Sequence, residues 1–108
     1  MTNWEIFNVS ELADSQSTDS YLPFFNVPTL SLGIYKISAG SQDMQSPHDD
    51  DEVYYVLSGS ARVQVGDDVR DVGAGDLLYV RATESHHFFE VKEDMTLLVV
   101  FASGPDGE

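Results

Sequence analysis

The second half of this chain is a series of short segments rich in β-branched, aromatic and aliphatic residues, with turn signals between them. The turns are marked by glycine and aspartate, as at Ser58-Gly59, Gly66-Asp67 and Gly73-Ala74-Gly75. No helical periodicity lies between these turns. This regular spacing predicts an all-β sandwich or barrel. We expect its strands at 29–38, 52–57, 61–65, 69–72, 77–80, 86–91 and 96–101.

The 108 residues suffice for one domain with a modest core. Residues 29–102 are expected to form the barrel, with 1–28 as an N-terminal arm or edge strands packed on it. Within that arm, the polar stretch 10–20 is predicted to be a loop with a turn of helix at 11–13. Residues 103–108 are predicted to be a flexible tail.

The charge balance is strongly acidic, with 19 acids against 5 bases and a formal net charge of −14. Such a field repels phosphate, so nucleic acid and anionic membranes are not expected partners. The chain has no cysteine and no apolar run long enough to span a bilayer, and we do not expect its first residues to be a signal peptide. We therefore expect a cytoplasmic protein.

The stretch 47–59 joins an acidic loop to a strand-like segment. His48 and Glu52 are four residues apart, so in an extended chain both side chains leave on one face, and Tyr54 follows them. A histidine and a carboxylate on one face can converge on a metal ion. The alternative is a solvated acidic loop that happens to contain a histidine.

This region resembles the first motif of the cupin family, and the resemblance extends over about 29–101. That motif runs glycine, five residues, His-x-His, three or four residues, glutamate, six residues, glycine. The matching positions here are Gly40, Ser46-Pro47-His48, Glu52 and Gly59, with Ser46 in place of the first histidine. The family resemblance implies a jelly-roll barrel, also called a double-stranded β-helix.

The second cupin motif is matched less completely. Gly75 and His86 stand where the family has its glycine and histidine, whereas Arg81, Thr83 and Glu90 replace proline, glycine and asparagine. One of the four usual metal ligands of the family is therefore absent from this chain. Water is the simplest occupant of the position left by Ser46, and the metal is expected to be weakly or partly bound.

Strand alternation places His86, Phe88 and Glu90 on one face. If that face is the barrel interior, His86 joins His48 and Glu52 there as a metal ligand. Two imidazoles and one carboxylate fit a divalent transition metal with open positions: Fe2+ is favoured, and Mn2+, Ni2+, Zn2+ or Co2+ would also fit. The alternative for His86 is a hydrogen-bonded core histidine.

Four further residues are candidates for the substrate pocket: Tyr54, Arg81, Phe88 and Glu90. Arg81 in a turn could bind an anionic group or be solvated. Glu90 could be a hydrogen-bond acceptor or general base, or an exposed strand-end acid. Tyr54 and Phe88 belong to an alternating set that is either pocket lining or core: Tyr54, Val56, Leu78, Val80, Phe88 and Leu98.

The opposite faces of the strands also carry apolar residues, and these predict a second packing surface: Val53, Tyr55, Leu57, Val99 and Phe101. Together with the resemblance to dimeric cupins, this surface indicates a homodimer.

Three functions remain open at this point. The first is a metal-dependent enzyme acting on a small organic molecule, of the oxygenase or isomerase type that this fold hosts. The second is a small-molecule or metal-binding sensor module without turnover. The third is an interaction protein whose barrel faces serve in dimerisation. A fold alone does not decide among them.

Overall fold

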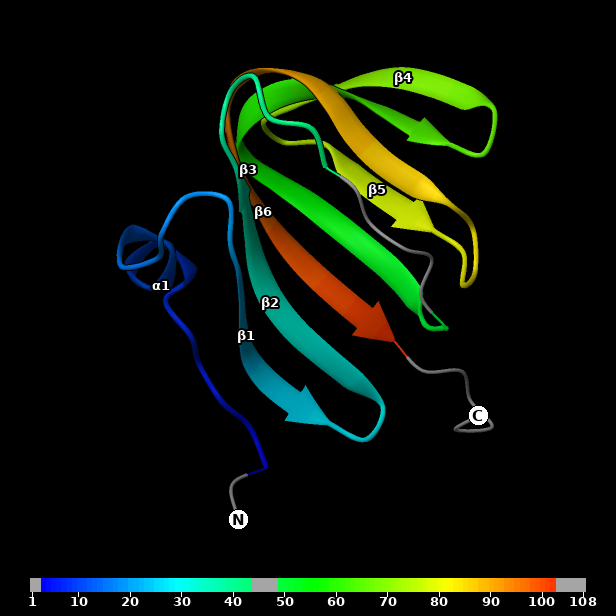
Figure 1. Ribbon diagram of the computed structural model, residues 1–108. Helices are drawn as coiled ribbons and strands as arrows, with labels where there is room; N and C mark the ends of the chain where they lie inside the picture. The colour runs from blue at the N-terminus through cyan, green and yellow to red at the C-terminus, as the bar shows by residue number, and fades with distance from the viewer. Residues whose placement is uncertain (1–2, 44–48, 103–108) are drawn as a thin grey trace.

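Two long strands, β3 (Asp51–Val65) and β6 (His86–Ala102), run antiparallel along their whole lengths and carry the other strands on their edges. The computed structural model describes residues 3–43 and 49–102. β5 (Leu77–Val80) pairs with the first half of β3 and β4 (Asp68–Gly73) with its second half. β2 (Leu30–Ile37) pairs with the end of β6, and β1 (Tyr21–Val27) pairs with β2 (Figure 1).

This mostly antiparallel architecture confirms the predicted all-β jelly-roll fold. Strands expected separately at 52–57 and 61–65 are one continuous strand, β3, and those expected at 86–91 and 96–101 are one strand, β6. The predicted tail, 103–108, lies outside the described residues. No helix among the described residues is long and apolar enough to cross a membrane.

The β3–β6 ribbon bends sharply where its register shifts, between Val56 and Arg62. Irregularities of this kind bend a strand and increase its local twist. Figure 1 shows the result: the first half of β6 and β4 lie in the upper part, and the β1–β2–β6–β3 sheet runs downward from the same bend. The Ser58-Gly59 turn signal therefore marks a bend inside a strand and does not end it.

Gly59 is required at this bend for two reasons. Its φ of +94° lies in the left-handed region that favours glycine. A Cβ atom there would also stand 2.3 Å from the backbone oxygen of Asp94 on β6. The two strands therefore approach so closely that no side chain fits between them.

The inner face of the barrel is filled by side chains from β3, β5 and both halves of β6. The largest fully buried apolar side chains on this face are Tyr54, Val56, Phe88, Met95, Leu97 and Val99. In β6 the buried residues have even numbers before Glu90 (His86, Phe88) and odd numbers from Val91 onward. The change occurs at Glu90, whose φ is +48°.

That change of parity corrects the expected faces of three residues. Val99 was expected outside but is buried, because it pairs with Tyr54 and cross-strand partners share a face. Phe101 likewise pairs with Glu52 on the inner side. Leu98, expected inside, is half-buried on the opposite face with its partner Tyr55.

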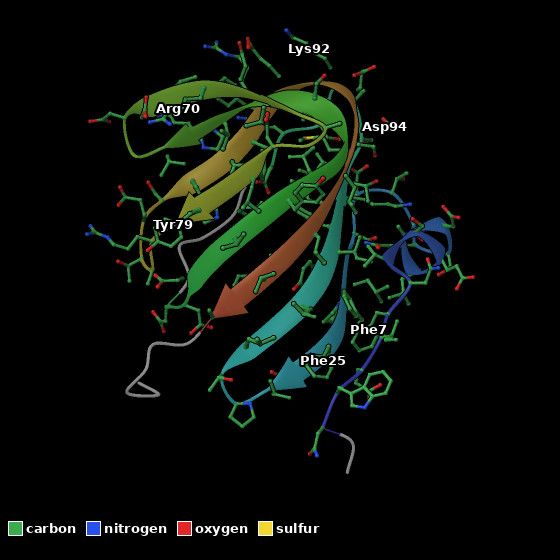
Figure 2. The ribbon with its side chains drawn as sticks, turned by 180° about the vertical axis from the view of Figure 1, so that it is seen from behind. Phe7, Phe25, Arg70, Tyr79, Lys92 and Asp94 are labelled. Atoms are coloured by element: carbon green, nitrogen blue, oxygen red, sulfur yellow. The ribbon has the colours of Figure 1, made fainter. Side chains whose placement is uncertain are left out.

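The predicted helical turn is present as α1 (Val9–Asp14), whose first turn is capped by the Asn8 side chain accepting from Glu11 N. Just after it, Gln16 donates a hydrogen bond to the carbonyl of Ile34, which is fully buried on the outer side of β2. Phe7 packs against Phe25 and its neighbour Phe24 (Figure 2). Phe7 and Gln16 thus attach the N-terminal segment to β1 and β2.

We expect Gly59→Ala to destabilise the fold by at least about 2 kcal/mol more than Gly75→Ala, because only the first combines left-handed strain with a backbone clash. Gly75 has a similar φ of +95° but nothing within 4 Å of its would-be Cβ. Urea unfolding of the two variants measures the difference. Equal losses of unfolding free energy would contradict the role assigned to the close approach at Gly59.

Candidate functional site

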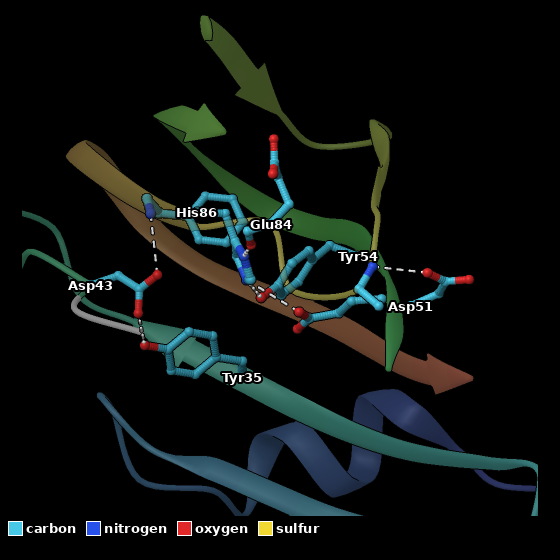
Figure 3. A network of polar contacts seen from close by, with 9 residues as sticks. Tyr35, Asp43, Asp51, Tyr54, Glu84 and His86 are labelled. Atoms are coloured by element: carbon cyan, nitrogen blue, oxygen red, sulfur yellow. Dashed lines mark hydrogen bonds and ion pairs between the residues drawn. The ribbon is translucent and has the colours of Figure 1, made fainter. Parts of the chain in front are cut away.

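Three polar side chains meet inside the barrel: Glu52 and Tyr54 from β3, and His86 from the start of β6. The His86 Nε2 atom lies 3.1 Å from Glu52 Oε1 and 3.0 Å from the Tyr54 hydroxyl oxygen (Figure 3). Glu52 is 2% exposed and His86 4%. The contact runs across the interior, because Glu52 pairs with Phe101 at one end of the ribbon and His86 with Val65 at the other.

The other imidazole nitrogen of His86 is held by the backbone. Its Nδ1 lies 3.0 Å from the carbonyl oxygen of Glu84, and since a carbonyl only accepts, Nδ1 carries the hydrogen. A carboxylate also only accepts, so the hydrogen bond to Glu52 needs a second hydrogen on Nε2, as in the imidazolium; when that hydrogen is lost, the Nε2 lone pair faces Glu52. The hydrogen bond with Glu52 raises the pKa of His86 above its ordinary value, against the opposing effect of burial.

The carboxylate of Glu52 is only half satisfied by these contacts. Its Oε2 atom is buried and has no hydrogen-bond partner among the residues that the structure describes. An unpartnered buried carboxylate oxygen costs free energy that a cation would recover. Once Nε2 has lost its hydrogen, this nitrogen and the carboxylate, 3.1 Å apart, form a donor pair that fits a divalent metal.

The third predicted ligand, His48, falls outside the described residues, as does Ser46. Within 3–43 and 49–102, no three histidine, aspartate or glutamate side chains are grouped so that they could hold a metal ion. The described part of the chain thus brings Glu52 and His86 together, two of the three residues expected to bind the metal.

The pocket candidates separate into two pairs. Tyr54 and Phe88 are both buried, and their rings meet edge to face with centroids 5.1 Å apart. Arg81 is exposed in the turn before β6. Glu90 is also exposed and lies 3.5 Å from Arg62, because the positive φ at this position turns it away from the face of His86 and Phe88.

Asp43 is a buried acid near this site that the sequence did not reveal. The Tyr35 hydroxyl donates to Asp43 Oδ1 at 2.5 Å, and the Phe88 backbone N–H donates to Oδ2 at 3.1 Å. The Asp43 N–H in turn donates to the Phe88 carbonyl. Burial, and then the bond to Asp43, raise the pKa of Tyr35. These contacts, seen in Figure 3, fix the chain to β6 immediately before 44–48.

Comparison with known proteins agrees with the fold and the partial motifs. The cupin-domain family model matches residues 33–101, so the chain belongs to the cupin family. The uncharacterized protein SCO3923 of Streptomyces coelicolor is 41% identical over 98 residues, which cover 89% of this chain and 93% of that protein.

Two solved structures share the architecture. The protein TT1209 from Thermus thermophilus is 27% identical with a TM-score of 0.76, and the match covers 94% of this chain and all (100%) of that one. The DMSP lyase DddQ from Ruegeria pomeroyi is 19% identical with a TM-score of 0.74, over 87% of this chain and 51% of that longer one. The second likeness concerns the fold alone.

Removing the Tyr35 hydroxyl or the Asp43 charge should destabilise the protein, because each leaves a buried hydrogen-bonding group without its partner. We expect Tyr35→Phe and Asp43→Asn to cost about 1–3 kcal/mol each. The double variant should show a coupling energy of about 1 kcal/mol, measured by urea unfolding.

Tyr79→Phe is the matched control, since the Tyr79 hydroxyl makes an exposed 3.4 Å contact with Asp51. It should change the unfolding free energy by less than about 0.5 kcal/mol. Additive effects of Tyr35→Phe and Asp43→Asn would argue against a direct bond between the two side chains.

Proposed function

We propose that this cupin binds a divalent transition metal, with Fe2+ favoured, through His48, Glu52 and His86, and acts on a small organic molecule in an oxygenase or isomerase type of reaction. The proposal rests chiefly on one observation. Glu52 Oε1 and His86 Nε2 are buried 3.1 Å apart, with the second carboxylate oxygen left without a partner among the described residues.

The surroundings of these two residues suit a metal site. The Glu84 carbonyl fixes the His86 ring so that Nε2 faces Glu52, and metal-binding histidines are commonly oriented in this way. Asp43 holds the chain next to 44–48, the segment that carries His48. The metal, when bound, would supply Lewis acidity and open coordination positions for a substrate.

Tyr54 is the residue best placed to handle a proton beside the metal site. Its hydroxyl oxygen lies 3.0 Å from His86 Nε2, and its ring is fixed edge to face against Phe88. A phenol at this position can hold a proton or pass it to a neighbouring group.

A sensor or binding module without turnover is the second candidate. Ser46, which replaces the first histidine of the family motif, favours it, because one ligand fewer should weaken metal binding. In this case the same residues would hold the metal or a small molecule, with no product formed.

Metal analysis tests the proposed ligands. Glu52→Gln and His86→Ala should each weaken the binding of Co2+ or Fe2+ to metal-stripped protein at least tenfold, as estimated roughly from losses at known metal sites. Each variant has a matched control in the described chain: Glu11→Gln, exposed on α1, and His87→Ala, on the opposite face of β6. Both controls should bind the metal as the wild type does.

Metal binding unchanged by Glu52→Gln would contradict the ligand assignment. If the metal binds as expected but no substrate turnover accompanies it across oxygenase and isomerase assays, the binding module replaces the enzyme.

We also propose that the protein is a homodimer that packs through the outer face of β3 and β5. Tyr55 pairs with Leu77 and Val53 with Tyr79, so these side chains share one face. Leu77 is 68% exposed and Tyr79 62%, which is unusual for residues of this size gathered on one sheet.

Leu77→Glu should convert the dimer to a monomer, because it places a charge in an apolar contact between strongly acidic subunits. Sedimentation velocity measures the change. Thr18→Glu adds the same charge at an exposed loop position and should leave the dimer intact. A wild-type protein that sediments as a monomer, or a Leu77→Glu dimer, would refute this interface.

A further inference from the structure

We propose that an aromatic groove beside Glu52, on the inner face of β1, β2 and the end of β6, binds an uncharged planar ring of the substrate. The groove has a volume of about 560 Å³, within the range of small-molecule sites. It is lined by Tyr21, Pro23, Asn26, Ser31 and Phe101, together with Phe24 and Phe25, which also contact Phe7. The inference rests on the proposed function, in that the metal site would hold the reactive end of the same molecule.

Direct strand pairing places the groove next to the candidate metal site. Ser31 pairs with Phe101 across β2 and β6, and Phe101 pairs with Glu52 across β6 and β3. Side chains opposite each other in this way share a face, with Cβ atoms about 4.5–5.5 Å apart. A ring lying against Phe101 is therefore one strand away from Glu52.

Tyr21 forms the wall of the groove, and Gly33 makes room for it. A Cβ atom on Gly33 would stand 2.1 Å from the Tyr21 hydroxyl oxygen, so the tyrosine lies directly over the bare backbone of β2. Its ring meets those of Tyr35 and Phe101 edge to face, each with centroids 6.4 Å apart. A glycine inside a strand often marks such a close approach.

One side of the Tyr21 ring is thus fixed while the other remains open, since the residue is 42% exposed. Burial, and then the charge of Glu52, raise the pKa of the Tyr21 hydroxyl. A fixed ring with one open side is a surface on which a planar ligand can stack.

The lining defines the chemistry of the ligand. Among the described residues that line the groove none is charged, and aromatic rings and proline predominate. Aromatic side chains prefer to stack offset or edge to face with other planar rings. The substrate class that fits is a small molecule whose uncharged planar ring carries an oxygen donor group directed at Glu52 and His86.

The probe for this groove is 2-naphthol, an uncharged planar ring with one hydroxyl group, titrated into metal-stripped protein and followed by its own fluorescence. We expect saturable binding by the wild type. Tyr21→Ala should weaken it roughly two- to tenfold, the effect of one aromatic contact. Phe89→Ala removes an aromatic ring that packs against His87 and Arg62, away from the groove, and should leave the binding unchanged.

Gly33→Ala gives an independent test, because the added methyl group must displace the Tyr21 ring. It should weaken 2-naphthol binding as Tyr21→Ala does, and the double variant should bind no more weakly than Tyr21→Ala alone. If Gly33→Ala does not fold, the comparison of Tyr21→Ala with Phe89→Ala still decides.

Absence of saturable binding to the wild type, or equal binding by wild type and Tyr21→Ala, would overturn the groove as a ring site. So would dissociation of a dimer by Tyr21→Ala, since the groove would then be a subunit contact. These results do not depend on metal: loss of the metal site with intact 2-naphthol binding would refute the proposed function and leave the groove standing.

Discussion

The pairing of β3 with β6 along their full lengths is the constraint on which the rest of the structure depends. Because the ladder bends near Gly59, one end of each strand is folded toward the other. Glu52, near one end of the ladder, consequently reaches His86, at the other, across the interior. The outer strands β1, β4 and β5 extend the ladder but do not create this contact.

Two buried carboxylates give the interior its chemical character. Asp43 is satisfied by Tyr35 and the backbone of Phe88, so its charge is stabilised by fixed donors. Glu52 has one imidazole beside it and a second oxygen without a partner in the described chain. In a protein with a net charge of −14, the surrounding field adds to the attraction that this oxygen exerts on a cation. The same field disfavours an anionic ligand unless a metal neutralises it.

The fold and the approach of Glu52 to His86 could be predicted from sequence because they depend on local spacing. Turn residues at regular intervals specify antiparallel strands, and the motif spacing places Glu52 and His86. The sequence did not predict which side chains of β6 face the interior after Glu90. Strand alternation assumes a regular extended backbone, and Glu90 interrupts it with a positive φ. Asp43, Tyr35 and Tyr21 were missed because their roles depend on contacts between residues far apart in sequence, as between Asp43 and Phe88 or Tyr21 and Phe101. Gly33 was the available signal for Tyr21: a glycine inside an otherwise regular strand indicates that something passes close by.

Tyr21 belongs to β1, an edge strand held to the barrel only by β2 among the described strands. An edge strand is paired on one side only, so fewer strand contacts constrain it than constrain a central strand. The residues at positions 52 and 86, by contrast, are fixed by the central ladder. Related barrels could therefore change the ligand that they bind through substitutions in β1, while the residues of the β3–β6 ladder and their chemistry stay the same.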